Sequence, residues 1–168
     1  NDLSLNNIAY IDTGLSSHGY SFSSDDKYID YLIDLNMNIA RQGCKLQVKV
    51  KPHPISRKNY LEKKLSENNI EILGNTNFVD DLRKCCACIT EPSTLGIIPS
   101  IMGLPLFLTR IDPLNSLLYG DVFTSYPRAM FLHLPDQFKT LLLKEREDVN
   151  YETVSKWIKS NAGALPAD

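Results

Sequence analysis

The sequence predicts an α/β domain, a doubly wound, Rossmann-like parallel sheet of about six strands with helices on both faces. Short apolar runs alternate with amphipathic stretches along the chain, which is typical of right-handed βαβ crossovers and of a parallel sheet. Two polar segments, residues 51–54 (KPHP) and 91–96 (EPSTLG), each follow an apolar run directly. Such segments lie at the carboxyl ends of strands, where a doubly wound sheet gathers its ligand.

The strands are expected where apolar residues form short runs bounded by turn-forming residues. The first run ends at Asp12-Thr13-Gly14, and a later one alternates Leu46 and Val48 with polar residues, which indicates one wetter face. The six expected strands span residues 8–11, 45–51, 70–73, 86–90, 105–109 and 130–133.

The first helix is expected to begin at Ser23 or Ser24, since either hydroxyl can cap it. Asp25 and Asp26 follow in the first turn, where the helix dipole favours acids, and Gly43 is a natural C-terminal stop. Later helices are expected over residues 56–68, 78–82, 94–102, 136–145 and 152–160.

The composition indicates one soluble globular domain over residues 1–161, with a frayed tail at 162–168. The net charge of −2 gives no support for binding to nucleic acid or to an anionic membrane. No apolar run reaches the length of a membrane span. We expect a cytoplasmic protein, or one held peripherally at the inner membrane through parts outside this chain.

The four cysteines are Cys44, Cys85, Cys86 and Cys88. Three of them lie within four residues at the start of one expected strand, and no second cluster supplies converging ligands for zinc. We therefore expect buried, reduced thiols, no metal site and no cofactor.

His53 is the first candidate site residue. Its two flanking prolines stiffen the backbone where the strand ends. An imidazole there can meet a phosphate oxygen in a charge-assisted hydrogen bond of roughly 1.5–3 kcal/mol, and Pro54 is expected to line the same site. The structural alternative is a loop histidine between prolines that only shape the strand exit.

Ser93 and Thr94 stand at the junction between the fourth apolar strand and an apolar helix. Either hydroxyl can cap that helix, and its N–H groups and dipole form an anion site. One hydroxyl can cap while its neighbour contacts the ligand. The carboxylate of Glu91 is unfavourable beside a phosphate, so we expect it to bind ribose hydroxyls or a base N–H, or to be an exposed acid at the strand end.

The remaining candidates lie in loops. Thr13 and Gly14 end the first strand, where a glycine permits close backbone approach to a ligand. In the following loop, Ser16 with its neighbours 17–18 is a candidate for contact with phosphate or sugar, with a plain turn as the alternative. Asp112 is a weak candidate for the same rim. His133 has no supporting partners in the sequence, and we expect it to be structural.

With these residues in place, the chain resembles the C-terminal, donor-binding half of GT-B glycosyltransferases. The resemblance is carried by residues 48–54, 77–82, 89–94 and 102–105. It is strongest toward bacterial polysialyltransferases and lipooligosaccharide sialyltransferases, which share an HP motif and a later serine motif. CDP-glycerol glycerophosphotransferases and the Kdo transferases of capsule synthesis look similar in these stretches.

The resemblance implies that His53 contacts the donor phosphate and assists departure of the nucleotide, while Ser93 and Thr94 hold the phosphate. The family often has two serines where this chain has Ser93-Thr94, which keeps both hydroxyls. The retaining-enzyme pattern of two glutamates fails, because Pro99 stands where the second would follow Glu91. An inverting, sialyltransferase-like branch is therefore favoured.

By the same resemblance, the donor is a CMP-sugar, with a UDP-sugar as the alternative, and the acceptor is a bacterial surface glycan. The chemistry is expected to need no metal. The general base is expected in an N-terminal acceptor domain of the same parent protein, outside this chain, so this domain alone can bind donor without turning it over.

Three other functions stay open at this point. A non-hydrolysing nucleotide-sugar epimerase uses a similar two-domain fold, and a glycerophosphotransferase or Kdo transferase would share the motifs. A non-enzymatic receiver or interaction domain is disfavoured, because Asp12 lacks a paired acid and Thr109-Arg110 follow the fifth expected strand in place of a lysine.

Overall fold

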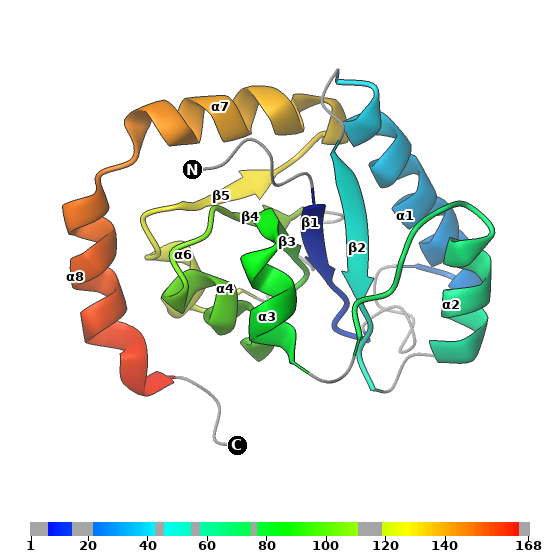
Figure 1. Cartoon of the computed structure of the whole chain (residues 1–168), viewed down its shortest axis with the longest axis horizontal. Coiled ribbons are helices and arrows are strands. Elements are labelled where there is room, and N and C mark those ends of the chain that lie inside the picture. Colours follow the sequence, from blue (N-terminus) through cyan, green and yellow to red (C-terminus); the bar gives the residue numbers. More distant parts are fainter. Residues whose placement is uncertain are drawn as a thin grey trace.

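Five parallel strands form one sheet in the order β2-β1-β3-β4-β5 (Figure 1). The structure is a computed structural model, and it describes residues 7–14, 22–42, 46–54, 58–74, 77–110 and 119–164. The strands are β1 (Asn7–Ile11), β2 (Gln47–Lys51), β3 (Cys85–Thr90), β4 (Leu106–Thr109) and β5 (Ala129–Leu132). The α/β fold predicted from the sequence is confirmed.

The expected strand at residues 70–73 is the exception, and the prediction of about six strands is corrected to five in the described chain. These residues form only an isolated bridge, in which Ile72 pairs with Val50 of β2. The Val50 N–H donates to the Glu71 carbonyl at 3.0 Å, and the Leu73 N–H donates to the Val50 carbonyl at 2.8 Å. Ile70 and Leu73 are buried, but the segment covers the β2 edge without extending into a full strand.

Helices cover both faces of the sheet (Figure 1). One face carries α1 (Asp25–Ala40), α2 (Lys58–Ser66) and α7 (Phe138–Asp148). The other face carries α3 (Phe78–Arg83), α4 (Ile97–Ile101), α6 (Asp121–Thr124) and α8 (Tyr151–Asn161). Short 3-10 turns are η2 (Thr94–Gly96), η3 (Pro135–Gln137) and η4 (Ala162–Ala164), the last within the tail expected to fray.

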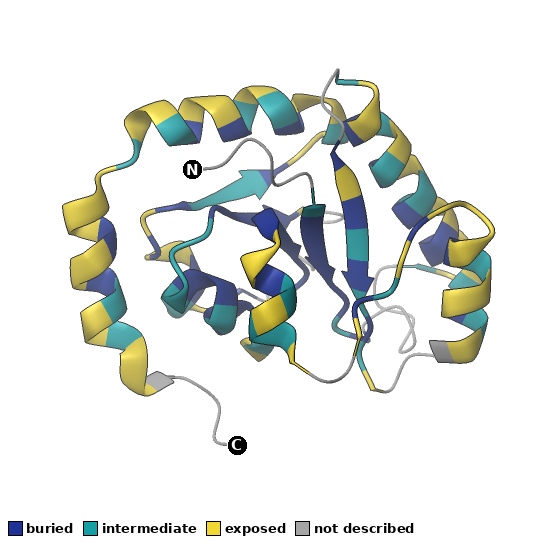
Figure 2. Ribbon diagram, viewed as in Figure 1, coloured by how far each residue is buried: buried dark blue, intermediate teal, exposed yellow. Residues whose placement is uncertain are grey.

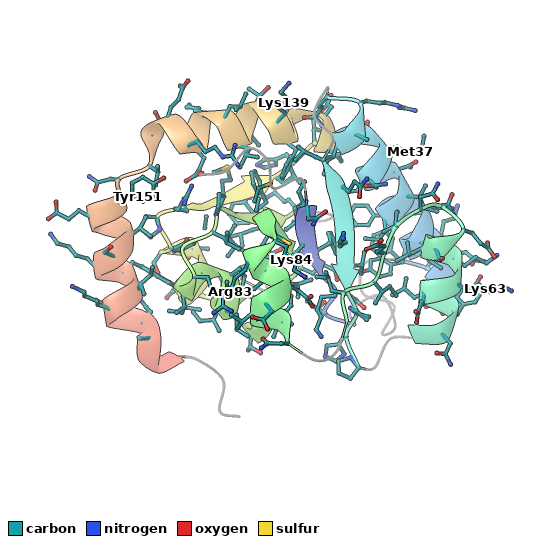
Figure 3. The ribbon with its side chains drawn as sticks, in the orientation of Figure 1. Met37, Lys63, Arg83, Lys84, Lys139 and Tyr151 are labelled. Atoms are coloured by element: carbon teal, nitrogen blue, oxygen red, sulfur yellow. The ribbon has the colours of Figure 1, made fainter. Side chains whose placement is uncertain are left out.

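Alternating side chains of the strands supply both cores. In β1, Ile8 and Tyr10 join the cluster under α1, whereas Ala9 and Ile11 join the cluster on the opposite face. Because both faces are covered, the strands read as nearly continuous apolar runs. Figure 2 shows the largely buried strands between helices whose outer sides are exposed, and Figure 3 shows a charged side chain, Lys63, on such an outer side.

Helix α1 begins where the sequence predicts. Ser24 is its N-cap, and its hydroxyl accepts the Lys27 N–H at 3.2 Å. Asp25 and Asp26 occupy the first turn. Gly43, the predicted stop, lies outside the described residues. Stable placement of α1 matters because its first turns lie beside the carboxyl ends of the strands.

The described cysteines Cys85, Cys86 and Cys88 are free and buried, as predicted. Burial raises the pKa of Cys85 to about 12 and raises that of Cys88 as well, so these thiols stay protonated. Within the described chain, no helix is both long enough and apolar enough to span a membrane.

The strand order places a topological switch point between β1 and β3. The chain leaves β1 toward β2 on one side, then crosses back to β3 on the other side of β1. The loops after β1 and β3 therefore diverge and open a crevice at the carboxyl edge. Both polar segments singled out in the sequence meet that edge.

Candidate functional site

The carboxyl ends of β1, β2 and β3 surround a cavity of about 570 Å³, called here the first cavity. Its walls come from three separate crossovers, which bring together the histidine segment and the serine segment predicted from the sequence. The lining residues are Asp12, Lys51, Pro52, His53, Pro54, Ser93, Thr94 and Leu95. Of the predicted site residues, the first cavity thus collects His53, Pro54, Ser93 and Thr94.

Asp12 links the β1 end to the β2 end. Its side chain is buried, and one carboxylate oxygen accepts the His53 backbone N–H at 3.0 Å while the other accepts the Gly14 N–H at 2.9 Å. The Asp12 N–H also donates to the Lys51 carbonyl at 3.0 Å. These bonds fix where the backbone of His53 enters the cavity.

Gly14 completes this turn for a conformational reason. Its φ is +76°, a left-handed conformation that glycine adopts without strain. The predicted role of Gly14 and Thr13 as ligand contacts stays a prediction, because neither lines the first cavity. Ser16, together with residues 17–18 and Asp112, lies outside the described residues.

Ser93 caps η2, as predicted for a hydroxyl at this junction. Its Oγ accepts the Leu95 N–H at 3.1 Å, and its carbonyl accepts the Gly96 N–H at 3.1 Å. Thr94 is exposed at the cavity wall. The Ser93 hydroxyl therefore caps the turn, and the neighbouring Thr94 lines the cavity.

The helix behind these hydroxyls is shorter than predicted. Residues 94–102 were expected to form one α-helix, but a 3-10 turn of three residues precedes the five-residue helix α4. Gly96 and Pro99 lower the α-helical propensity of this stretch, and Pro99 lacks an N–H. Because few peptide dipoles are aligned, hydroxyls and side-chain cations must contribute more to anion binding here than a helix dipole does.

Lys51 supplies a cation that was not among the predicted site residues. Its ammonium lies 5.6 Å from the centre of the Phe78 ring, a cation–π contact, and its side chain lines the first cavity. Its position directly before Pro52-His53 was a signal available in the sequence. A lysine, a histidine and two hydroxyls around one space suit a phosphate.

Glu91 is buried, with 2 % of its surface exposed, so the alternative of an exposed acid at the strand end is wrong. The hydroxyls of Tyr10 and Tyr28 each donate to its Oε2 at 2.6 Å. The Thr13 hydroxyl donates to Oε1 at 3.1 Å. The carboxylate therefore ties β1, α1 and β3 together behind the first cavity, and its expected contact with ribose or base stays a prediction.

The pKa of Glu91 is raised to about 7. Burial is the main cause, the nearby charge of Asp12 adds to it, and the donated hydrogen bonds oppose it. The same burial and the Glu91 charge raise the pKa of Tyr10 and of Tyr28, which keeps both as hydroxyl donors. Tyr10 lies in the first expected strand and Tyr28 in the first expected helix. That both donate to Glu91 is seen only in the three-dimensional fold.

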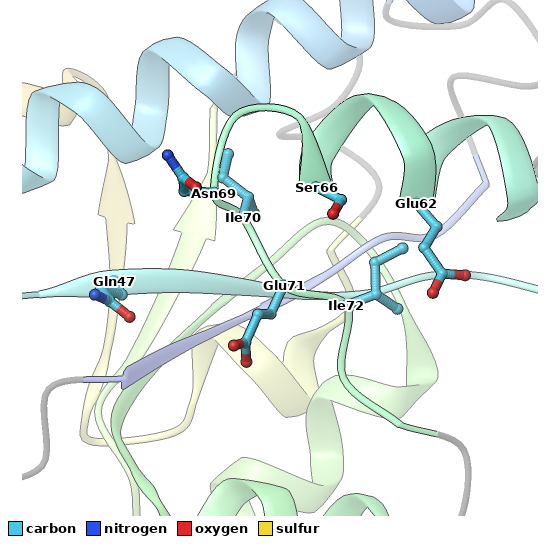
Figure 4. A pocket seen from close by; sticks show the side chains of 7 residues that line it. All are labelled: Gln47, Glu62, Ser66, Asn69, Ile70, Glu71 and Ile72. Carbon is cyan, nitrogen blue, oxygen red and sulfur yellow. The ribbon is translucent and has the colours of Figure 1, made fainter.

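A different cavity lies beside the β2 edge (Figure 4). Its lining residues are Gln47, Glu62, Ser66, Asn69, Ile70, Glu71 and Ile72. Glu71 pairs with the Lys49 ammonium at 2.9 Å, and this hydrogen bond lowers the pKa of Glu71. With two carboxylates and no cationic side chain among its lining residues, this cavity does not suit a phosphate.

Comparison with known proteins gives one solved structure of similar fold. The chain is similar to the C-terminal CMP-Kdo binding domain of WaaA from Acinetobacter baumannii, with a TM-score of 0.53. The match covers 98 % of this chain and 92 % of that domain at 11 % sequence identity. At this identity the likeness establishes the fold alone. No family model and no curated protein matches the sequence.

Proposed function

We propose that this domain binds the nucleotide-activated donor of a glycosyltransferase that transfers sialic acid or a similar sugar to a bacterial surface glycan. The observation that carries the proposal is the first cavity, which collects Lys51, His53, Ser93 and Thr94 at the topological switch point. The domain of similar fold is named for binding CMP-Kdo, which supports a CMP-sugar as the donor class.

In the proposed reaction, the bond between the anomeric carbon and a phosphate oxygen of the donor breaks. Its electron pair remains on the phosphate, and an acceptor hydroxyl forms the new bond to the anomeric carbon from the opposite face. The acceptor proton passes to a base that we propose lies in an N-terminal domain outside this chain. The configuration of the sugar is thereby inverted.

The residues of the first cavity act on the leaving nucleotide. Negative charge grows on the phosphate as the bond breaks, and donors that are already in place stabilise that charge most effectively. We assign the His53 imidazole and the Thr94 hydroxyl to the phosphate oxygens, with the Lys51 ammonium providing additional positive charge. These groups are proposed to act without a metal ion.

A thermal-shift panel of CMP, CDP, UDP and GDP on this chain tests the proposal. We expect CMP to raise the melting temperature most, and we expect the shift to persist in EDTA. His53→Ala and Thr94→Ala should reduce the CMP shift, each judged against its own ligand-free melting temperature. Ser66→Ala, which removes an exposed serine from α2, is the matched control.

The outcomes separate the alternatives. No shift with any nucleotide at millimolar concentration would remove the proposal. A larger shift with CDP than with CMP would favour a glycerophosphotransferase. For the parent protein, sugar transfer assays with CMP-sialic acid and CMP-Kdo decide between the two sugars.

A further inference from the structure

A second cavity, of about 660 Å³, lies between α1 and the carboxyl ends of β4 and β5. It is on the α1 face of the sheet, toward the edge opposite to β2. Its lining residues are Phe22, Lys27, Asp30, Tyr31, Asp34, Leu35, Asn38, Arg110, Leu132, His133 and Pro135. None of them was assigned to a site from the sequence, and none lines the first cavity.

One rim of the second cavity is cationic. Arg110 directly follows β4 and His133 directly follows β5, so neighbouring parallel strands place them together. The Arg110 Nη1 lies 3.1 Å from the His133 Nε2, and the guanidinium carbon lies 4.7 Å from the centre of the Phe131 ring. Among the described residues, Arg110 forms no ion pair with a carboxylate.

These contacts hold the guanidinium plane at the mouth of the cavity. A planar guanidinium presents two parallel N–H donors to one carboxylate or phosphate group. An arginine that already rests on an aromatic face and an imidazole loses less conformational freedom when it binds. The expectation of a purely structural His133 does not explain why an exposed imidazole lies against an exposed arginine.

The α1 wall carries both signs of charge, because Lys27 lines it together with Asp30 and Asp34. Asp30 and Asp34 are exposed and lie one helical turn apart, so their carboxylates line the same side of α1. Phe22 and Tyr31 form an aromatic pair with ring centres 5.2 Å apart. The cavity thus offers acceptors for hydroxyl groups, an apolar ring surface, and a cationic rim.

We infer that the second cavity binds an acidic sugar, a carbohydrate that carries a carboxylate or a phosphate. Arg110 and His133 would hold the anionic group, and Asp30 and Asp34 would accept hydrogen bonds from ring hydroxyls. This inference rests on the proposed function, because it makes the carboxyl edge of the sheet one binding surface for a nucleotide and an acidic sugar. It assigns residues to hold the acidic sugar, and these residues lie outside the first cavity.

A chain of side-chain contacts runs from the second cavity to Glu91. The Tyr31 hydroxyl, in the wall of the second cavity, lies 3.4 Å from the Tyr10 hydroxyl. Tyr10 in turn donates to Glu91 behind the first cavity.

Saturation-transfer NMR titrations of the full chain test the inference with glucuronate, glucose 6-phosphate and glucose. We expect both acidic sugars to bind more tightly than glucose. Whichever of the two binds more tightly shows whether the cavity prefers a carboxylate or a phosphate. Arg110→Gln should lower the affinity for the more tightly bound acidic sugar about tenfold or more, which corresponds to one lost charge-assisted contact. Arg41→Gln, an exposed arginine at the C-cap of α1, should leave it unchanged.

Equal binding of glucose and the acids, or an unchanged affinity in Arg110→Gln, would overturn the inference. Circular dichroism of both variants controls for folding, and His133→Gln provides a second variant at the same rim. The CMP thermal shift is measured in parallel. If CMP shifts the melting temperature but acidic sugars fail to bind, only this inference falls. If acidic sugars bind but CMP gives no shift, only the proposal of nucleotide binding falls.

Discussion

Two buried glutamates stand at opposite ends of the sheet, and the protein neutralises them in different ways. Glu145 of α7 receives two hydrogen bonds from the Arg128 guanidinium, at 2.5 and 2.8 Å, just before β5 begins. Arg128 also donates to the Gly103 carbonyl at 2.8 Å. Glu91, just after β3, is surrounded by hydroxyl donors, and within the described chain no cationic side chain contacts it.

We call the end of the sheet with the Arg128–Glu145 ion pair the closed end, and the end with Glu91 the adjustable end. A guanidinium pairs with Glu145 and joins α7 to the amino-terminal side of β4 and β5. Hydroxyl donors only partly offset the burial of Glu91, so its pKa rises to about 7 and its charge becomes sensitive to pH near neutrality. The adjustable end is also the end that carries both cavities.

The largest expected effect comes from breaking the ion pair. Arg128→Met should lower the free energy of unfolding by about 3–5 kcal/mol, because it leaves the buried Glu145 carboxyl group without its ion-pair partner. Urea denaturation measures the change, and Arg128→Met with Glu145→Leu should recover most of it.

The matched control for that experiment is Arg83→Met. Arg83 pairs with Asp80 at 2.5 Å, but both side chains are more than half exposed, so removing the pair should cost less than about 1 kcal/mol. If Arg128→Met and Arg83→Met lowered the free energy of unfolding by similar amounts, burial of the Arg128–Glu145 pair would not matter for stability.

A smaller effect is expected for Glu91→Gln, and it depends on pH. Because the folded pKa of about 7 exceeds the ordinary value of 4.5, the folded state binds more protons than the unfolded state in that interval. The stability associated with Glu91 is therefore fully present below pH 4.5 and is lost as pH rises through 7, by about 3 kcal/mol in all.

The measurement compares the free energy of unfolding of the natural chain and Glu91→Gln in urea from pH 4.5 to 7.5. Glutamine does not titrate, so the variant should lack this decline, while contributions from other groups cancel in the difference. Parallel pH profiles for the two proteins would show that Glu91 keeps an ordinary pKa.

The smallest of these effects is expected for Asp12→Asn. An amide offers one acceptor in place of two, so either the His53 or the Gly14 N–H loses its partner, at a cost of about 1–2 kcal/mol. If Asp12 positions His53, the CMP thermal shift should also fall. Asp136→Asn in η3, an exposed acid far along the chain, is the control, and an unaltered CMP shift would show that His53 needs no such support.

The sequence predicted the alternation of strands and helices because local patterns encode it. It also predicted that His53 and Ser93 share one edge, since each follows a strand and parallel strands end together. It did not predict the role of Asp12, Tyr10 or Tyr28. Their partners are 41, 81 and 63 residues away along the chain, and no local pattern reports such pairings.

Two errors in the predicted elements have local causes. The apolar run at 70–73 has strand composition, but only Ile72 pairs with β2. The predicted helix at 94–102 has apolar periodicity, and Gly96 with Pro99 divides it into a turn and a short helix. In both cases hydrophobicity indicated burial correctly and overestimated the length of regular structure.

The bridge between Ile72 and Val50 has a consequence for self-association. An outermost strand exposes N–H and C=O groups that can recruit a strand from another molecule. Here the backbone of residues 71–73 already occupies the donor and the acceptor of Val50, so a foreign strand would first have to displace it. Sheet-to-sheet aggregation through β2 is thereby disfavoured by a few residues that never become a strand.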